Sequence, residues 1–498
     1  MPRSFHLVPA LALAGVIIST LALGQAAGPG TLTLAMPIEP PNLDPTTGAA
    51  AAIREVTYRN IYEGLTRIDR SGAVQPALAK SWTLSDDGLT YRFTLESGVT
   101  FHDGSPLTSA DVKFSLDRAR APDSTNAQKQ LFEPIAEVAT PDAQTVVITL
   151  KRPTGLFLWN LGWGDAVIFS EKSAATNKTN PIGTGAFKFA AWTRGDRVVL
   201  EKNPAYRAAA QVKLDKVIFR FIGDAQAQAA ALKAGEVDAM PNLGAPELFE
   251  DFQKDPRFKT VAGSTEGEIV AGFNNTRKPL DDARVRRALT QAVDRKALVD
   301  AAYNGIGQPI GSHFSPGQPG YIDLTSVLPY DPKAAKAALA AAGYPNGFSL
   351  TLRVPQMTYA RRSAEVMAAM FQDIGVTLTL EPIEFPGQWL DQVFKRTDYD
   401  MTIVAHTEPL DIGIYARDAY YFNYRNAAMK AIMAEVNATA DTPQRLALLG
   451  KAQKQLAEDA PALFLFLLPK LGVWNAKLKG LWDNQPIPAN DVVEVSWH

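Results

Sequence analysis

The chain has 498 residues, 46% hydrophobic and 20% charged, which is enough for large buried cores and about three domains of roughly 150 residues each. Its 50 Lys and Arg residues nearly balance its 52 Asp and Glu residues, which argues against the strongly basic surface of nucleic-acid-binding proteins. The absence of cysteine excludes a disulfide framework, a thiolate metal site, a catalytic cysteine and a lipid-modified cysteine. We therefore expect no nucleic-acid partner.

The N-terminus has the pattern of a secretory signal peptide. Arg3 precedes an apolar run from Leu7 to Leu23, and small residues follow as far as Ala27. The alternative is a membrane anchor, but about 17 apolar residues lie at the lower limit for spanning a bilayer. We predict that residues 1–27 are cleaved and that the protein is exported to the periplasm without a lipid anchor.

The first half of the chain alternates short strands with loops. Thr31–Ala35 reads as a strand that enters the proline-rich loop Pro37–Pro45, which we expect to face a cleft and to place Asn42 near a ligand. Helices are predicted to begin near Ser109 and near Asp224, and the second is predicted to end at Gly235. Further strands are expected at Tyr91–Leu95, Val146–Leu150, Val198–Glu201 and Lys216–Ile222.

The second half predicts repeated strand, helix, strand units. Asp331 and Pro332 begin a helix that ends before Gly343. The elements that follow are the strand Phe348–Val354, a helix over Tyr359–Ile374, the strand Val376–Leu380, a helix near Gln388–Lys395 and the strand Tyr399–Ala405. The apolar stripe predicted for the helix over Tyr359–Ile374 is Val366, Met370 and Ile374. This order predicts a largely parallel sheet with helices on both faces, and ligand contacts in the loops Pro355–Ala360 and His406–Tyr415.

Catalytic motifs are missing from the sequence. There is no GxSxG or HExxH motif and no phosphate-binding loop, so we expect no enzyme and no cofactor. A carboxylate pair of a secreted hydrolase cannot be recognised from sequence and stays open as a remote alternative. His102 fits a hydrogen-bonded turn, and His313 lies in a glycine-rich loop. His406 follows a strand and is the one candidate for a metal contact, although we predict no dedicated metal site.

Several motifs occur in a shared order along nearly the whole chain after residue 27. They are YEGL (62–65), LAKSW (78–82), DDG (86–88), FHDG (101–104), SADVKFSLDR (109–118), PIGTGAF (181–187), KNPAY (202–206), LKAGEVDAM (232–240), FNNTRKPLDDARVRRALTQAVDR (273–295) and YDPKAAKAALAAAGYPNG (330–347). In these motifs the chain closely resembles the family 5 solute-binding proteins of ABC importers, which bind dipeptides, oligopeptides and nickel.

The resemblance implies an α/β fold with two lobes that close on a ligand. The expected first lobe is discontinuous, the inserted small domain is special to the family, and a hinge is expected near Phe273 to Lys278. The expected divisions are 28–66, 180–272 and 469–498 for the first lobe, 67–179 for the inserted domain and 273–468 for the second lobe.

The resemblance also suggests ligand contacts. Trp389 aligns with a pocket tryptophan of oligopeptide binders, and His406 falls near a second one. Glu408 or Asp411 could replace the aspartate that holds a peptide amine, although the alternative for each is an exposed loop charge.

Further candidate ligand contacts are Arg353, Arg361 and Tyr415. An arginine at a strand end could hold a carboxylate, while Arg361 could equally lie on a solvated helix face. The aromatic run at positions 420–424 and the pair Trp159 and Trp163 could form pocket walls or packed core.

These expectations give a periplasmic binding component of an ABC importer that delivers short peptides or peptide-like amino compounds to a membrane permease. We expect a monomer. The alternative within the same fold is a binder of a nickel chelate, an opine or an oligosaccharide, with His406 as a metal or polar contact.

Overall fold

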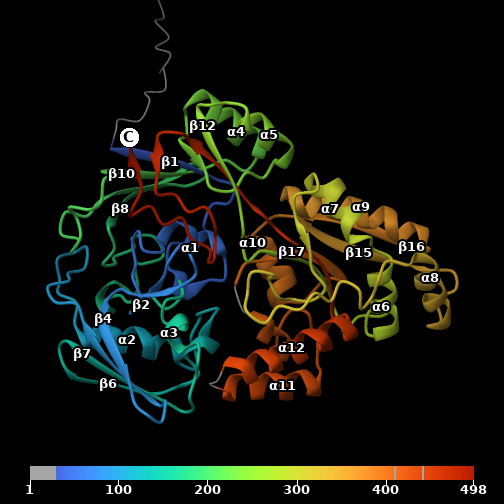
Figure 1. The fold of residues 1–498 in the computed structure, drawn as a ribbon, viewed down its shortest axis with the longest axis horizontal. Helices are drawn as coiled ribbons and strands as arrows, with labels where there is room; N and C mark the ends of the chain where they lie inside the picture. The colour runs from blue at the N-terminus through green and yellow to red at the C-terminus, as the bar shows by residue number, and fades with distance from the viewer. Residues whose placement is uncertain (1–29, 409–410, 440–441) are drawn as a thin grey trace, which may run out of the picture.

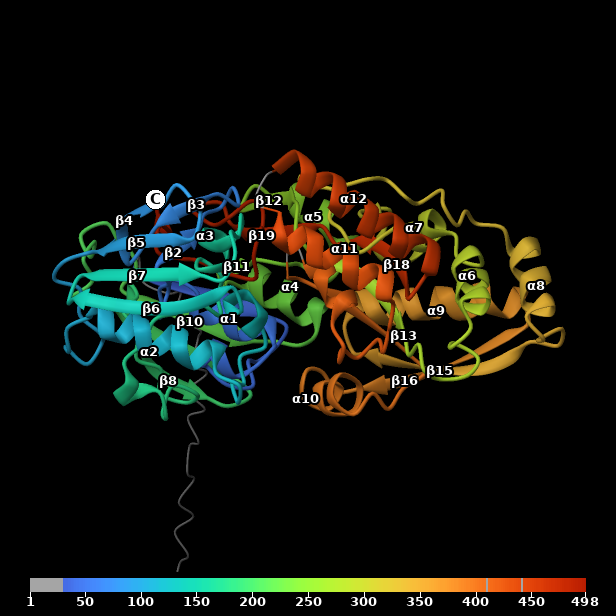
Figure 2. The ribbon, with the colours of Figure 1, turned by 90° about the horizontal axis from the view of Figure 1, so that it is seen from below.

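The computed structural model describes residues 30–408, 411–439 and 442–498, so the predicted signal peptide lies outside the described residues. Two mixed β-sheets organise the two halves of the molecule, and a smaller antiparallel sheet lies beside the first (Figures 1 and 2). Among the helices of the described ranges, none is long and apolar enough to cross a membrane.

The first lobe is built on a seven-stranded sheet. In spatial order its strands are β12 (Phe258–Gly263), β19 (Lys470–Asn475), β11 (Ala239–Met240), β1 (Thr31–Met36), β10 (Lys216–Phe221), β9 (Arg197–Lys202) and β8 (Phe187–Thr193). The predicted strand Thr31–Ala35 is thus confirmed and lies inside the sheet, parallel to β10 and β11. The helices of this lobe are α1 (Ala51–Thr57), α4 (Ala225–Ala234) and α5 (Phe249–Gln253).

The inserted domain carries an antiparallel sheet with the order β4 (Ala79–Leu84), β5 (Thr90–Leu95), β7 (Thr145–Leu150) and β6 (Ile135–Asp142). Figure 2 shows these strands side by side in this order. The helices α2 (Ser109–Arg120) and α3 (Phe157–Asn160) accompany it, and the ribbon of β2 (Thr66–Ile68) and β3 (Val74–Pro76) leads into it. The predicted start of α2 is confirmed, because Thr108 and Asp111 form a reciprocal capping box.

The second lobe is built on a six-stranded sheet. Its strands, in spatial order, are β14 (Gln308–Pro309), β18 (Ala462–Leu467), β13 (Glu268–Phe273), β17 (Met401–His406), β15 (Phe348–Pro355) and β16 (Val376–Ile383). The helices and helical turns are α6 (Ala283–Gln291), α7 (Arg295–Tyr303), α8 (Pro332–Ala341), α9 (Thr358–Asp373), α10 (Gly387–Trp389), the π-helical turn η5 (Leu390–Lys395), the 3-10 turn η6 (Asp411–Ala416), α11 (Ala427–Ala438) and α12 (Thr442–Asp459).

Helices cover both faces of the second sheet, as predicted. Along β13, Ile269 and Ala271 belong to the core under α6 to α9, whereas Val270 belongs to the core under α10 to α12. The expectation of a largely parallel sheet is wrong, because β15 is parallel to β16 and β17 while β13, β14 and β18 pair antiparallel. The antiparallel strands include β13 and β18, which carry the chain into and out of this lobe.

Predicted helix ends agree closely with the structure in two cases. Asp224 caps α4 through the backbone N–H of Ala227, and Gly235 ends it in the left-handed conformation. Asp331 caps α8 in the same way. The apolar face of α9 is shifted from the predicted one, since Met367 and Phe371 are fully buried whereas Met370 is half-buried.

Two segments connect the lobes. The chain passes from β12 to β13 through residues 264–267 and from β18 to β19 through residues 468–469. The two crossings are hydrogen-bonded to each other, because Leu468 N–H donates to the Gly267 carbonyl at 2.8 Å. This corrects the hinge expected near Phe273 to Lys278, since Phe273 ends β13 within the second sheet. The domain boundaries themselves stay predictions.

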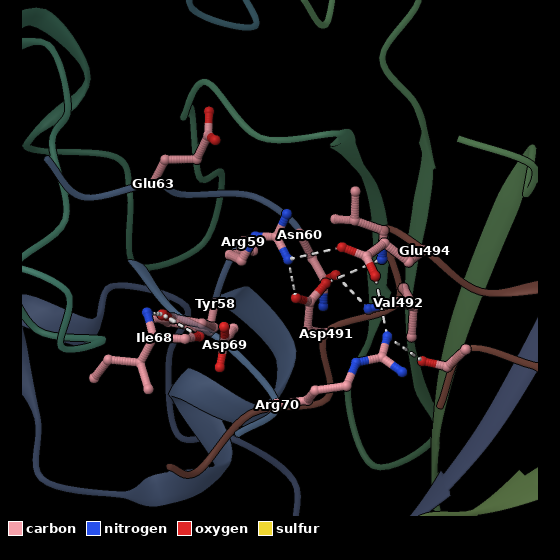
Figure 3. Close-up of polar contacts among 12 residues, drawn as sticks. Tyr58, Arg59, Asn60, Glu63, Ile68, Asp69, Arg70, Asp491, Val492 and Glu494 are labelled. Atoms are coloured by element: carbon pink, nitrogen blue, oxygen red, sulfur yellow. Dashed lines mark hydrogen bonds and ion pairs between the residues drawn. The ribbon is translucent and has the colours of Figure 1, made fainter. Parts of the chain in front are cut away.

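The C-terminal segment, which includes the ribbon of β20 (Leu478–Lys479) and β21 (Ser496–Trp497), returns to the first lobe. Figure 3 shows Arg59 in an ion pair with Asp491, and Arg70 pairs with Glu494 at 3.0 Å. Val492 N–H donates to the Asn60 side chain at 3.2 Å. These contacts join residues more than 400 positions apart, which makes the first lobe discontinuous in sequence.

Candidate functional site

A cavity of about 280 Å³ lies between the two lobes. In the first lobe it is lined by Met36–Ile38 at the end of β1 and by residues 49–52 and 55. The two segments that connect the lobes line it through residues 265–267 and 468–469. The second lobe adds Gln356–Tyr359 after β15 and Val404–Glu408 at the end of β17. Both loops predicted for ligand contact therefore reach the cavity, as expected for the carboxyl ends of parallel strands.

A second cavity of about 380 Å³ lies between the inserted domain and the second lobe. Trp159 and Trp163 line it as a stacked pair with ring centroids 5.3 Å apart. The two cavities share Gln128, Glu408, Asp411 and Arg417 as lining residues. The two cavities therefore adjoin each other at these four residues.

Aromatic side chains form one wall of the first cavity. Trp389 is 5% exposed and its indole N–H donates to the Thr402 hydroxyl at 2.9 Å. Its ring packs edge-on against Tyr421, with centroids 5.4 Å apart, and Tyr420 and Phe394 complete the wall. This wall offers a large apolar surface that is held rigidly by packing.

Glu408 is joined to the first lobe. Its carboxylate accepts from Arg54 Nη2 of α1 at 2.7 Å, and Arg54 Nη1 also lies 3.1 Å from Asp165. The Arg54 side chain is only 1% exposed, and burial raises the pKa of Asp165 to about 6 against the opposing effect of Arg54. Glu408 is therefore neutralised by a protein cation and bridges the two lobes.

Asp411 is held by two histidines. One oxygen lies 2.6 Å from His313 Nε2 and the other 3.4 Å from His406 Nδ1. Burial raises the pKa of Asp411, but His313 and His406 outweigh burial and lower it overall. Asp411 and His406 both line the cavity, and His313 lies behind them in the core.

Two acids and one base line the cavity without an ion pair to another described residue. Glu266, in the segment between β12 and β13, accepts from the Gln318 side chain, and burial raises its pKa to about 7. Glu55, on α1 of the first lobe, has no ion pair within 4 Å, and burial raises its pKa. Arg417, in the second lobe, lies over the Tyr420 ring at 5.3 Å and has no carboxylate partner in the described part of the chain. Among the described residues, Glu266 has the Gln318 amide as a partner, whereas the Glu55 carboxylate has none, so Glu55 and Arg417 are the two unmatched groups of opposite sign.

Four of the predicted contacts lie outside the set that lines the first cavity. Asn42 accepts from the Asp44 backbone within its own loop, and Arg353 pairs with Glu381 at 2.7 Å. The Arg361 side chain is 59% exposed, and Tyr415 is buried against Phe422. The structure brings Trp389, His406, Glu408 and Asp411 to the cavity; Asn42, Arg353 and Arg361 do not reach it, and Tyr415 lies behind the lining, against His313.

Sequence reasoning missed Arg54, Glu55 and Arg417. Arg54 and Glu55 lie in α1 between the buried apolar residues Ile53 and Val56, and charged residues inside an apolar segment are a signal that could have been used. Arg417 has no comparable signal, because its position in a loop is typical of any solvated arginine.

Comparisons with known proteins agree with this geometry. The glutathione-binding protein GsiB of Pectobacterium atrosepticum is 30% identical over 465 residues, which cover 89% of each chain. The periplasmic protein DppA of Helicobacter pylori, solved with the peptide STSA, is 26% identical with a TM-score of 0.84, covering 94% of this chain and 98% of its own. AgaA from A. tumefaciens R10, solved with agropinic acid, is 26% identical with a TM-score of 0.86, covering 94% and 99%.

A family profile covers the middle of the chain. The profile of the bacterial extracellular solute-binding proteins, family 5, matches residues 73–428, which is more than half of the sequence. The two lobes, the inserted domain and the cavity at the carboxyl ends of β1, β15 and β17 agree with that match. The chain belongs to the family 5 bacterial extracellular solute-binding proteins.

Proposed function

We propose that this protein is the periplasmic binding component of an ABC importer and carries a short peptide or peptide-like amino compound to a membrane permease. A peptide ligand is supported by the relative GsiB, which aligns with 89% of this chain and is named for binding glutathione. Glutathione is a tripeptide with a free amine and two carboxylates. The family consists of binding proteins, and the described residues form a cavity without a recognisable catalytic arrangement.

The observation that carries the proposal is the pair of unmatched charges across the cavity. Glu55 of the first lobe can accept hydrogen bonds from a ligand amine, and Arg417 of the second lobe can hold a carboxylate in a two-pronged contact. The wall of Trp389 and Tyr420 packs against the ligand between them. A zwitterionic ligand that contacts both side chains bridges the two lobes.

Closure follows from that geometry. A ligand shifts the lobes toward the closed form only by contacts that it makes better there, and contacts with Glu55 and Arg417 come from opposite lobes. Glu408 contributes through Arg54, because the Arg54–Glu408 ion pair forms across the same gap. The closed form is then the form that the permease recognises.

Identification of the natural ligand tests the proposal. The mature protein is purified without denaturant, denatured, and the released small molecules are analysed by mass spectrometry. We expect a peptide or an amine with a carboxylate in about one equivalent per protein. An opine, a sugar or a metal chelate in that amount would overturn the peptide assignment, and Glu55→Gln, which keeps the shape of the side chain, should lose the peptide.

A further inference from the structure

Three side chains that are distant in sequence meet beneath the cavity. His313 comes from the loop after β14, His406 from the end of β17 and Asp411 from the start of η6. One nitrogen or oxygen atom from each lies within 4.8 Å of the others. The two imidazole rings are nearly perpendicular, with centroids 4.8 Å apart, so that both rings direct a nitrogen toward Asp411.

The outer nitrogen of each histidine is held by a tyrosine. His313 Nδ1 lies 3.2 Å from the Tyr415 hydroxyl, and His406 Nε2 lies 2.7 Å from the Tyr421 hydroxyl. Such partners fix the ring orientation and the tautomer of metal-binding histidines. The inner nitrogens, His313 Nε2 and His406 Nδ1, both face the Asp411 carboxylate.

A buried carboxylate on the neighbouring strand is a second, independent observation. Glu268 of β13 is paired directly with His406 of β17, and the two side chains lie on the same face as Val270 and Val404. Glu268 is 2% exposed, and its Oε2 has no hydrogen-bond partner among the described residues. An unpaired buried carboxylate is costly unless a cation or a proton compensates it.

We propose that His313, His406 and Asp411 bind a resident divalent transition-metal ion, with the buried carboxylate of Glu268 on the neighbouring strand adding a second negative charge. Two neutral imidazoles and two carboxylates carry two negative charges, which a divalent cation neutralises in the buried site. Mixed nitrogen and oxygen ligands favour Zn²⁺ or a similar ion over Mg²⁺ and Ca²⁺, which prefer oxygen alone. His313 would bind through Nε2 as the neutral tautomer that carries its proton on Nδ1, beside the Tyr415 hydroxyl.

The ion has a structural consequence for the cavity. His406 and Asp411 stand at the two ends of the loop that carries Glu408, and both would be ligands of the same ion. The ion therefore fixes the loop in the position from which Glu408 reaches Arg54 of the other lobe. It is a resident ion beneath the cavity and not the transported solute.

Metal titration of the protein without a polyhistidine tag tests this assignment. After chelator treatment and dialysis, Zn²⁺ is titrated by calorimetry, and Co²⁺ is followed by its visible absorption. We expect one equivalent of Zn²⁺ and a Co²⁺ spectrum typical of nitrogen and oxygen ligands. His313→Gln and His406→Gln should each weaken Zn²⁺ binding by at least about tenfold, as loss of a ligand or of its support does.

His102→Gln is the matched control, because His102 binds the backbone of Gly183 and Gly185 far from this cluster in sequence. It should bind Zn²⁺ like the unmodified protein. Equal Zn²⁺ affinity in the unmodified protein, His313→Gln and His406→Gln would overturn the proposal and leave a hydrogen-bonded histidine cluster. If these variants do not fold, the unmodified protein still tests the proposal, because a Co²⁺ spectrum like that of the aqueous ion would overturn it. Both measurements are made without a peptide ligand, so their outcome is independent of the proposed function.

Discussion

Arg54 of the first lobe and Glu408 of the second lobe form an ion pair across the ligand cavity, with 2.7 Å between Nη2 and Oε1. Glu408 was one of two acids that the sequence offered for a ligand amine. In the structure its charge is matched by a buried arginine, and the Asp411 carboxylate is enclosed by two histidines, at 2.6 Å from His313 and 3.4 Å from His406. The amine-binding role therefore passes, in our proposal, to Glu55.

Glu408→Gln should weaken ligand binding by about tenfold, which corresponds to about 1.4 kcal/mol. The change removes the ion pair that favours the closed lobes, while Arg54 keeps Asp165 as its partner. Calorimetric titration gives the affinity, and small-angle scattering should show a larger radius of gyration for the ligand-free variant. Glu381→Gln is the matched control, since it breaks the 2.7 Å ion pair with Arg353 inside the second lobe. Unchanged affinity and radius in Glu408→Gln would refute the bridge.

Arg417→Met should weaken binding of a ligand with a free carboxylate by about tenfold or more, because it removes the cavity's unpaired guanidinium. The same ligand with that carboxylate amidated should bind both proteins equally. Arg361→Met changes an arginine that is 59% exposed and outside the cavity lining, so it should leave affinity unchanged. The reverse pattern, with Arg361 required and Arg417 dispensable, would restore the contact expected from the sequence.

Trp389→Ala should lower the free energy of unfolding by about 3–5 kcal/mol, the usual cost of truncating a buried tryptophan. It should also weaken ligand binding, because the indole forms part of the cavity wall. Denaturant unfolding and calorimetry separate the two effects. Trp474→Ala, in β19, removes a tryptophan that is 2% exposed and outside the cavity lining. It should match the loss of stability and keep the affinity; equal affinity loss in both variants would make Trp389 a purely structural residue.

His102 should make the protein sensitive to acid. Burial lowers the pKa of His102 to about 4, from an ordinary value of 6.5, while its hydrogen bond to Gly185 opposes the shift. A lowered pKa in the folded state means that the neutral imidazole stabilises the fold above pH 6.5 and that this contribution is lost as the pH falls toward 4. At about 1.4 kcal/mol per pKa unit, the loss is about 3 kcal/mol.

Denaturant unfolding of the unmodified protein and His102→Gln between pH 4 and pH 7 measures this contribution. Glutamine can keep both hydrogen bonds to the backbone and does not titrate in this range. The stability of the variant should therefore fall less than that of the unmodified protein below pH 6.5. Parallel curves would show that His102 is not the titrating group.

The sequence predicted the local structure well where capping and periodicity are strong. The ends of α4 and α8 follow from Asp224, Gly235 and Asp331, whose side chains or backbone satisfy helix ends locally. Strand direction was less predictable, because whether β13 and β18 run antiparallel depends on how the chain crosses between lobes. No local pattern encodes that path.

The candidate site was predictable only in part. Strand ends located the two loops, because the carboxyl ends of parallel strands meet at one edge, and the resemblance to oligopeptide binders located Trp389. The Arg54–Glu408 pair joins residues 354 positions apart, and the cluster of His313 with Asp411 joins residues 98 positions apart. Such pairs depend on tertiary contacts, so the sequence alone could not show which carboxylates are paired inside the protein and which are available to a ligand.

The most direct test of the central claim is calorimetric titration of the ligand-free protein with glutathione and a series of dipeptides and tripeptides. Our account predicts saturable binding of one such compound per protein, and loss of that binding in Glu55→Gln and Arg417→Met. If none of these compounds bound while an opine, a sugar or a nickel chelate did, the two-lobed fold would stand and the peptide-like ligand would be wrong.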